Sequence, residues 1–179
     1  MSLFIIIVML LLLLVVFFFS AGQFFNVLIR GQAPLISTSR RVIAAILREV
    51  TLQEGEAFYE LGAGKTRILR ALEKRYPLAK YVGVEFAWFP YLWSRALNGL
   101  TGRAIEMRRQ NLFKADISQA DYIYCYLLPD MMGPLEEKLR REGKPGATLI
   151  SLVFQLRANP YKTVIVSPRQ TLYFYKIIR

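Results

Sequence analysis

The chain has 179 residues, of which 54% are apolar, and its formal net charge at pH 7 is +11. This length is sufficient for one domain of ordinary size with an appendage. Histidine is absent and Cys125 is the single cysteine. These counts exclude Ser-His-Asp and Cys-His catalysis, most zinc sites and any internal disulfide, so we expect no metal.

The first 29 residues carry no charged side chain, and Leu3–Phe19 is an unbroken apolar run of 17 residues. A membrane-spanning helix needs about 20 largely apolar residues, so residues 1–29 are expected to form a transmembrane anchor. Positive charges begin only at Arg30. By the positive-inside rule, the rest of the chain then lies on the cytoplasmic side of a single-pass membrane protein, or in an equivalent compartment.

Two alternatives to a permanent anchor stay open. A cleaved signal peptide would have a basic n-region, which this chain lacks, and Ser20-Ala21-Gly22 is a poor cleavage site. A buried core helix would carry a one-sided polar face, which is missing over Leu3–Phe19.

All of the charge of +11 belongs to residues 30–179. Beside a membrane, such charge attracts anionic headgroups, with about 1 kcal/mol for each Lys or Arg near the surface. Nucleic acid is the alternative partner for a basic protein. No DNA-binding or RNA-binding motif is visible in the sequence, so we do not expect nucleic-acid binding.

Residues 30–55 are expected to form a linker and an amphipathic helix. Gly31-Gln32-Ala33-Pro34 fits a short linker. After the candidate N-caps Ser37, Thr38 and Ser39, apolar residues recur at helical spacing as far as Val50.

From residue 56 onward, strand-like and helix-like segments alternate. Strands are expected at 57–61, 81–85, 104–107, 122–126 and 147–152, and helices at about 65–75, 90–99 and 131–141. Two last strands, 163–166 and 171–178, are expected to form a hairpin. This alternation predicts that residues 56–179 form an α/β domain with a mostly parallel sheet and an antiparallel C-terminal hairpin.

One stretch combines a strand end, a tight turn and a helix start: Glu60-Leu61-Gly62-Ala63-Gly64. Glycines at such a turn let the backbone approach a ligand, and the N–H groups of the helix start favour an anionic group. A second acid, Glu85, follows 25 residues after Glu60 at the end of the next strand. In nucleotide-binding α/β folds, an acid there typically accepts hydrogen bonds from ribose hydroxyls.

Several stretches together resemble a known family. They are Leu35-Ile36-Ser37-Thr38, the Glu60 motif, Gly83-Val84-Glu85, Asn111-Leu112-Phe113 and Tyr126-Leu127-Leu128-Pro129. The Glu60 motif resembles motif I of class I methyltransferases, which have a Rossmann-like fold and use S-adenosylmethionine. With the N-terminal apolar segment, the set resembles the small membrane-anchored protein-lysine methyltransferases of the FAM173 type and their prokaryotic relatives, over about residues 34–155.

The resemblance implies S-adenosylmethionine as the cofactor and assigns residues to it. The implied cofactor-binding residues are Thr38, Glu60, Gly62, Gly64, Thr66, Glu85, Asn111 and Phe113, and the implied catalytic residues are Tyr126 and Pro129. The chain departs from the family pattern at three of these positions. Thr66 replaces a usual glycine, Glu60 stands where Asp is commoner, and Asn111 stands where the family often has Asp.

Other interpretations of individual residues stay open. Glu60 could only cap the following helix, and Asn111 could only stabilise a turn. The aromatic residues Trp88, Phe89, Tyr91 and Trp93 suit the core or a membrane-interface belt better than a base-stacking platform.

We therefore expect a membrane-anchored, S-adenosylmethionine-dependent methyltransferase that methylates lysine on a protein, itself membrane-associated. A methyltransferase for a lipid or small molecule is the first alternative. A catalytically inactive, membrane-bound scaffold of the same fold is the second, because Thr66 departs from the glycine pattern.

Overall fold

The computed structural model describes residues 3–30 and 38–178, with side chains for 3–22 and 38–178. The chain forms two compact units, Met1–Leu35 and Ile36–Arg179. The linker expected at residues 31–34 and the family stretch at 35–37 lie outside the described residues. The domain division expected at residue 56 remains a prediction.

The first unit contains helix α1, Leu3–Arg30. Its segment Leu3–Gly22 has a mean hydropathy of 3.4, and no part of the segment is buried. The helix is therefore long and apolar enough to cross a membrane. A signal sequence, or the core helix of a soluble protein, passes the same test of length and composition.

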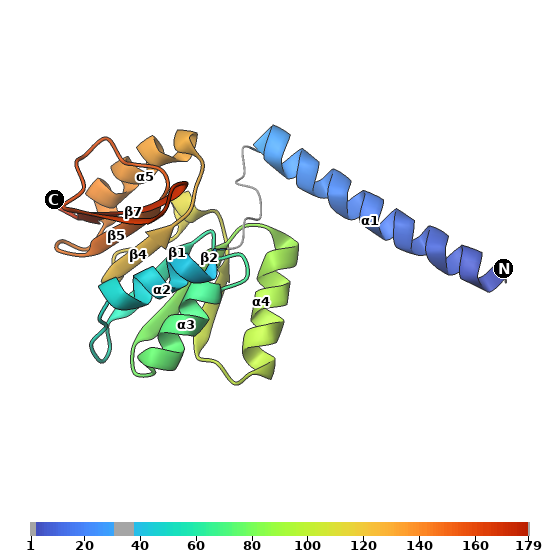
Figure 1. The fold of residues 1–179 in the computed structure, drawn as a ribbon, viewed down its shortest axis with the longest axis horizontal. Coiled ribbons are helices and arrows are strands. Elements are labelled where there is room, and N and C mark those ends of the chain that lie inside the picture. The colour runs from blue at the N-terminus through green and yellow to red at the C-terminus, as the bar shows by residue number, and fades with distance from the viewer. Residues whose placement is uncertain (1–2, 31–37, 179) are drawn as a thin grey trace. The chain divides into compact units, whose positions relative to one another are not determined.

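The second unit is built on one seven-stranded sheet with the order β3-β2-β1-β4-β5-β7-β6 (Figure 1). The strands are β1 (Ala57–Leu61), β2 (Lys80–Glu85), β3 (Ile105–Arg109), β4 (Tyr122–Cys125), β5 (Thr148–Leu152), β6 (Lys162–Ser167) and β7 (Gln170–Lys176). The first five pair in parallel, whereas β7 runs antiparallel to both β5 and β6. This topology confirms the expected Rossmann-like fold with its antiparallel C-terminal hairpin.

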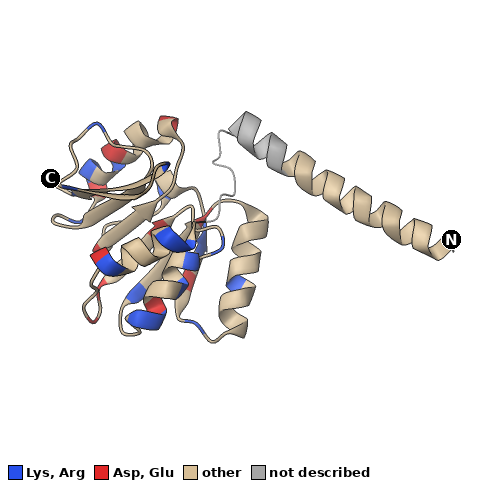
Figure 2. Ribbon diagram, viewed as in Figure 1, with Lys and Arg blue, Asp and Glu red and all other residues tan. Residues whose placement is uncertain are grey.

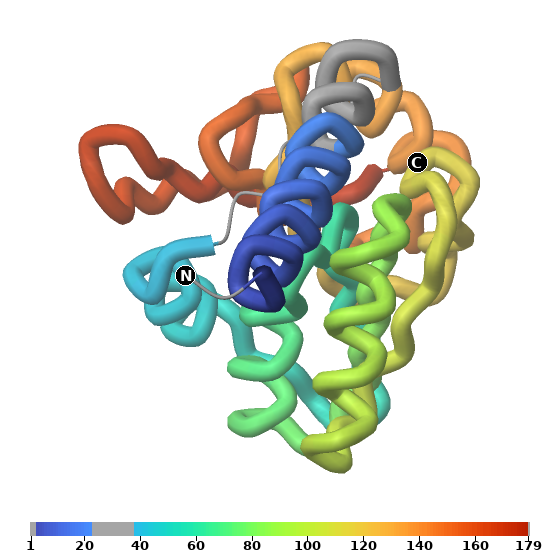
Figure 3. Tube along the Cα trace, turned by 90° about the vertical axis from the view of Figure 1, so that its right-hand side faces the viewer, coloured from blue at the N-terminus to red at the C-terminus, as the bar shows by residue number. Residues whose placement is uncertain are grey.

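Helices cover both faces of the sheet. They are α2 (Arg40–Glu49), α3 (Arg67–Arg75), α4 (Trp88–Leu100), α5 (Pro129–Glu142) and the short 3₁₀ helix η1 (Leu112–Lys114). Side chains alternate along β1, so that Phe58 packs with α2 and α3 while Leu61 packs with α5. Both faces of β1, β2, β4 and β5 are therefore largely buried, as their apolar sequences require, whereas the edge strand β3 is mostly exposed or half-buried. Figures 1 and 3 both show α3 and α4 side by side.

Three helices begin at residues other than those expected. α4 begins at Trp88 and not at about residue 90. α3 begins at Arg67 and not at about Lys65, because Thr66 adopts a left-handed backbone conformation with φ 50°. α5 begins at Pro129 and not at Met131, because the fixed φ of proline suits the first helical position. Pro129 is therefore the first residue of the helix that follows the Tyr126–Leu128 loop.

Candidate active site

The first strand leads into a glycine bend at the carboxyl edge of the sheet, formed by residues 62–66. After β1 ends at Leu61, Gly62 takes φ 79° and Gly64 takes φ 48°, a region that favours glycine. The N–H groups of Gly62 and Ala63 donate to the Val84 carbonyl at 2.8 and 3.0 Å. The bend is therefore held against the end of β2, at the edge where parallel sheets of this class bind ligands.

Thr66 ends the glycine bend in the left-handed conformation, at the position where the resembled family has its third glycine. A β-branched residue in this conformation costs about 1–2 kcal/mol. The Thr66 side chain is buried, and its hydroxyl donates to Asn98 Oδ1 over 3.5 Å. Thr66 thus adopts, with local strain, a backbone conformation that favours glycine.

Glu85 joins the glycine bend to the segment that enters α4. Its Oε2 accepts from the Gly64 N–H at 2.9 Å, and its Oε1 accepts from the Ala87 N–H at 2.8 Å. Burial raises the pKa of the Glu85 carboxyl, and the N–H groups of Ala87, Gly64 and Phe86 oppose that rise. The carboxylate therefore lies inside the fold, against the backbone of the bend.

Glu60, on β1, is the second buried acid, with 4% of its surface exposed. Burial raises its pKa well above 4.5, and the charge of Glu85 raises it further. The Leu69 N–H and the Arg70 guanidinium oppose the rise. The two carboxylates are thus close enough to interact. Because Leu69 lies in the first turn of α3, Glu60 is also placed to stabilise the start of that helix. The Oε2 atom of Glu60 has no hydrogen-bond partner within the described residues.

Tyr124 lies beside Glu60, since the two residues are register partners on β4 and β1. Burial raises the pKa of Tyr124, and the Thr38 side chain opposes that rise. By distance and angle, however, the Tyr124 hydroxyl has no hydrogen-bond partner in the described part of the chain. Thr38 is therefore a neighbour of Tyr124 and not its hydrogen-bond partner. The Thr38 carbonyl also accepts from Arg67 Nη1 at 2.8 Å, so Thr38 belongs to the same cluster.

Asn111 and Phe113 follow β3 at the same edge of the sheet. The Gln110 N–H donates to the Glu85 carbonyl at 3.2 Å, which holds this segment next to β2. Asn111 Oδ1 accepts a hydrogen bond from the Phe113 N–H at 2.9 Å. Asn111 therefore stabilises a turn, which is one of the two roles that the sequence left open for it. Phe113 is partly buried against the core on the α5 side. Contact of either residue with an adenine ring stays a prediction.

The loop after β4 approaches the glycine bend. A Cβ placed on Gly62 would lie 3.6 Å from Leu127 Cδ2, so this apolar side chain adjoins the bend. Tyr126 is partly buried, and Pro129 is exposed at the start of α5. An apolar loop therefore lies next to the glycine bend.

Sequence reasoning missed Tyr124 and Ser94, and it assigned no role to Gly83 beyond the Gly83-Val84-Glu85 stretch. Tyr124 adjoins Glu60 only through the strand register, which the sequence does not specify. A Cβ on Gly83 would come within 3.0 Å of Ala63 Cβ. Because Gly83 has no side chain, the glycine bend can pack directly against β2. The Ser94 hydroxyl of α4 donates to the Gly64 carbonyl at 2.6 Å. Two features of the sequence could have revealed these residues: Gly83 is a glycine inside a strand, and Ser94 is a polar residue inside a mostly apolar helix.

The donor set suits a cationic ligand that carries hydroxyl or amine groups. Glu60 Oε2 and Tyr124 Oη are buried without partners in the described part of the chain, and such an atom costs about 1–3 kcal/mol. The amine, ribose hydroxyls and sulfonium of S-adenosylmethionine could satisfy or complement these groups. Among the described residues, no group of three His, Cys, Asp or Glu side chains is arranged to hold a metal.

Known proteins match this chain over most of its length. The family model described as "ANTKMT methyltransferase domain" matches residues 60–162. A protein-lysine N-methyltransferase of Saccharolobus islandicus (strain REY15A) is 32% identical over 151 residues, which cover 80% of this chain and 93% of the relative.

Solved structures show the same fold. An RNA methyltransferase from Salinibacter ruber, in complex with S-adenosyl-L-homocysteine, has a TM-score of 0.73 and 30% identity, covering 80% of this chain and 95% of its own. An S-adenosylmethionine-dependent methyltransferase from Aquifex aeolicus has a TM-score of 0.62 and 18% identity, covering 76% of this chain and 89% of its own; at that identity the likeness concerns the fold alone. With the glycine bend and two buried acids at the ligand edge, these matches lead to one conclusion: the chain belongs to the ANTKMT methyltransferase domain family and is a class I S-adenosylmethionine-dependent methyltransferase.

Proposed function

We propose that this methyltransferase modifies the lysine ε-amino group of a membrane-associated protein. The observation that carries the proposal is the similarity to the Saccharolobus islandicus protein-lysine N-methyltransferase, which extends over 93% of that protein. The apolar loop that adjoins the glycine bend through Leu127 is the feature of this chain that suits a lysine side chain.

The proposed cofactor site uses the cluster around the glycine bend. S-adenosylmethionine supplies an electrophilic methyl group on a sulfonium, so the reaction needs neither a metal nor a covalent enzyme intermediate. Glu85 would bind the ribose hydroxyls, because each carboxylate oxygen can accept a second hydrogen bond besides those from Gly64 and Ala87. Glu60 and Thr38 would hold the methionine portion.

Five further residues complete the proposed cofactor site. Gly62, Gly64 and Thr66 would give the close backbone approach. The Asn111 amide would donate to the adenine ring, since its oxygen already accepts from the Phe113 N–H. Phe113 would line the adenine side of the site.

The loop after β4 would surround the ε-amine of the substrate lysine. A lysine reacts only as the neutral amine, and its reference pKa is about 10.4. Apolar surroundings disfavour the charged form, so Leu127 and Pro129 would lower the lysine pKa and exclude water, while the Tyr126 hydroxyl would orient the amine. Tyr126, Leu127 and Pro129 would hold the lysine nitrogen in line with the methyl group that the bound cofactor would supply. The methyl group would pass from sulfur to nitrogen, and the nitrogen would lose its surplus proton to solvent. Alignment of these atoms is the main catalytic contribution.

The test is transfer of labelled methyl groups. Full-length protein is incubated with methyl-labelled S-adenosylmethionine and a membrane extract, and the products are separated into protein, lipid and RNA fractions. Label in methyllysine of the protein fraction is the expected result. Glu60→Ala should abolish it, whereas Glu54→Ala, in an exposed turn, should not. Label in the lipid fraction alone would replace the lysine proposal, and cofactor binding without any transfer would indicate a scaffold.

RNA is a second candidate substrate, favoured by one observation. The Salinibacter ruber structure, 30% identical to this chain, is named an RNA methyltransferase, and the present chain carries a net charge of +11. The same experiment decides, because RNA methylation would place the label in the RNA fraction and leave methyllysine unlabelled.

We also propose that α1 anchors the enzyme in a membrane with the second unit on the cytoplasmic side. Support comes from the apolar segment Leu3–Gly22 and from the first charge at Arg30. An anchored enzyme meets membrane-associated substrates at a raised effective concentration. Mass spectrometry of the protein from membranes washed at alkaline pH should find residues 3–22 retained; a mature chain that lacks them would identify a signal sequence instead.

A further inference from the structure

Helix α4 exposes its apolar side chains. Trp88, Leu92 and Trp93 are 59%, 41% and 53% exposed, and Phe89 and Leu100 are exposed as well. Spacings of three, four, seven and eight residues place these side chains on one side of the helix. They form a contiguous surface, here called the α4 face.

The opposite side of α4, which packs on the fold, is polar. Its buried residues are Pro90, Ser94 and Asn98. Ser94 bonds to the Gly64 carbonyl at 2.6 Å, and Asn98 accepts from the Thr66 hydroxyl over 3.5 Å. A surface helix of a soluble domain normally shows the reverse arrangement, with apolar residues inward. The exposed face of α4 is therefore not explained by the packing of this domain.

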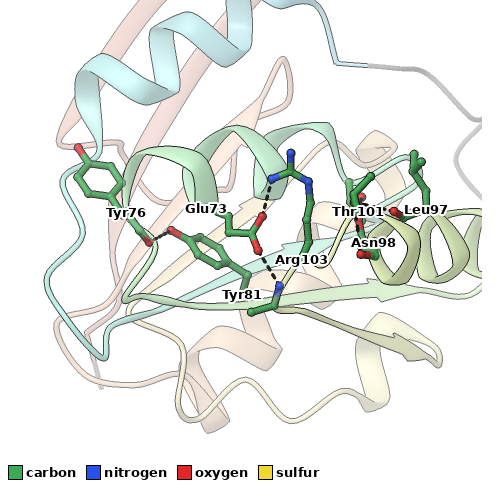
Figure 4. A network of polar contacts seen from close by, with 9 residues as sticks. Glu73, Tyr76, Tyr81, Leu97, Asn98, Thr101 and Arg103 are labelled. Atoms are coloured by element: carbon green, nitrogen blue, oxygen red, sulfur yellow. Dashed lines mark hydrogen bonds and ion pairs between the residues drawn. The ribbon is translucent and has the colours of Figure 1, made fainter.

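Both ends of α4 are tied to the rest of the unit. At the N-terminal end, Glu85 accepts from the N–H of the N-cap residue Ala87. Beyond the C-terminal end, the Glu73 carboxylate of α3 accepts from Arg103 Nη1 and from the Ala104 N–H, both at 2.7 Å (Figure 4). The helix is thus fixed in place with its apolar side outward.

Arg95 and Arg109 place positive charge on and beside the α4 face. Trp88–Leu100 contains no acid, and Arg95 is its single charged residue. The Arg109 guanidinium, from the end of β3, lies 4.5 Å from the centroid of the Trp88 ring. Figure 2 shows α4 almost entirely tan beside the red and blue bands of α3.

We propose that the α4 face binds the headgroup region of an anionic lipid bilayer. Tryptophan prefers the membrane interface, and arginine beside it pairs with anionic headgroups. A helix with an apolar, aromatic side and no acid is suited to lie in the plane of that interface. The inference rests on the proposed membrane attachment, which would keep this surface close to lipid.

The placement of α4 gives such binding a consequence for the reaction. Trp88 follows Glu85 by three residues, so the α4 face begins at the edge of the sheet that holds the proposed cofactor site. Binding of α4 to headgroups would hold that edge close to the bilayer surface. Lysines at headgroup level would then be favoured over lysines far from the membrane.

The chain offers an intrinsic probe, because Trp88 and Trp93 are its two tryptophans and both lie on the α4 face. Full-length protein is placed in nanodiscs of phosphatidylcholine and phosphatidylglycerol, with and without bromine on the acyl carbons nearest the headgroup. We expect bromine to lower tryptophan emission at least about twofold, and high salt or phosphatidylcholine alone to reverse part of the effect, because the charge attraction is screened or removed.

Two results would overturn the proposal. Emission that stays sensitive to acrylamide and insensitive to bromine would show an α4 face in water, awaiting a protein partner. Tryptophan emission that is insensitive to acrylamide and also unchanged by bromine, salt and headgroup charge would show that protein, which could be α1, covers the α4 face. Co-elution of the chain with the nanodiscs tests the anchor separately. If the chain does not co-elute, brominated vesicles added to the protein in solution test the α4 face in the same way.

Variants confirm which surface is responsible. Leu92→Ser removes one apolar side chain of the α4 face and should weaken the bromine effect, with cofactor binding unchanged as evidence of folding. Leu78→Ser changes a residue that is 65% exposed outside α4 and should leave the bromine effect intact. Equal effects of the two variants would contradict an interaction specific to α4.

Discussion

Helices α3 and α4 are neighbours on one face of the sheet, yet their burial patterns are opposite. α3 buries Ile68, Leu69 and Leu72 and directs its charged residues outward. α4 buries Ser94 and Asn98 and exposes tryptophan, phenylalanine and leucine. Both sequences contain enough apolar residues for a core helix, so apolar content alone does not reveal which side chains stabilise the fold.

The difference separates two physical roles. Burial of the apolar side of α3 contributes directly to the free energy of folding, at roughly 25 cal/mol for each Å² removed from water. α4 is attached by hydrogen bonds, among them those that reach Gly64 and Thr66 in the glycine bend. Its apolar side remains available for another surface, while its polar side supports the glycine bend, where the cofactor site is proposed.

The largest predicted effect contrasts two leucines. Leu72→Ala, at a position with 0% exposure on α3, should lower the free energy of unfolding by about 2–5 kcal/mol, because it leaves a cavity in the core. Leu92→Ala on α4 should change it by less than about 1 kcal/mol. Denaturant unfolding followed by circular dichroism measures both. Similar losses for the two variants would refute the contrast between the helices.

Ser94→Ala tests the polar attachment of α4. The Gly64 carbonyl would lose a hydrogen bond of 2.6 Å at a site with little access to water, which should cost about 1–3 kcal/mol. The glycine bend would also lose a support, so the affinity for S-adenosylmethionine should fall in calorimetry. Ser118→Ala, a serine remote from the bend in an exposed turn, is the matched control and should be near neutral. An unaltered Ser94 variant would mean that α4 is held in another way.

Glu60 and Glu85 make the stability of the ligand-free protein depend on pH. The pKa of each is raised in the folded state, so the folded state binds these protons more tightly than the unfolded state. Their stabilising contribution is complete below about 4.5, the reference pKa for both groups. It is lost as the pH rises through the raised pKa values. The melting temperature should therefore fall as the pH rises across this range, because the stabilising contribution of these two groups is lost.

Glu60→Gln, next to α3, should remove much of that decline, because the neutral amide carries no buried charge. At neutral pH the variant should be more stable by about 0.5–2 kcal/mol and should lose cofactor binding, a common exchange of function for stability at active sites. Glu85→Gln, next to α4, should flatten the pH profile less. If Glu60→Gln is instead less stable at neutral pH, the buried carboxylate is compensated in a way that the structure does not indicate.

Much of the fold could be predicted from the sequence because its signals are local. Alternating apolar segments separated by turn residues located each strand within a few residues, and the glycine bend and Glu85 followed from the end of β1 and the spacing to β2. Tyr124 could not be found, because its position beside Glu60 depends on strand register. The roles proposed for the site residues stay predictions until they are measured.

The aromatic residues of α4 show where sequence reasoning reaches its limit. A core position and an interface position both suit tryptophan, and only the burial of Ser94 and Asn98 decides which side of the helix faces inward. The core alternative is wrong for Trp88 and Trp93, which are more than half exposed. The start of α3 was also misplaced, because a left-handed threonine is rare enough that no local pattern predicts it.

Thr66 gives the smallest predicted effect and the finest test of the link between the two helices. Thr66→Gly and Thr66→Ala both remove the bond to Asn98, but only glycine relieves the left-handed backbone. The glycine variant should therefore be more stable than the alanine variant by about 1 kcal/mol, measured by thermal unfolding. It should also keep the higher affinity for S-adenosylmethionine, because the bend retains its conformation without strain. Equal stability of the two variants would show that α3 and α4, and not the local conformational preference, hold residue 66 in place.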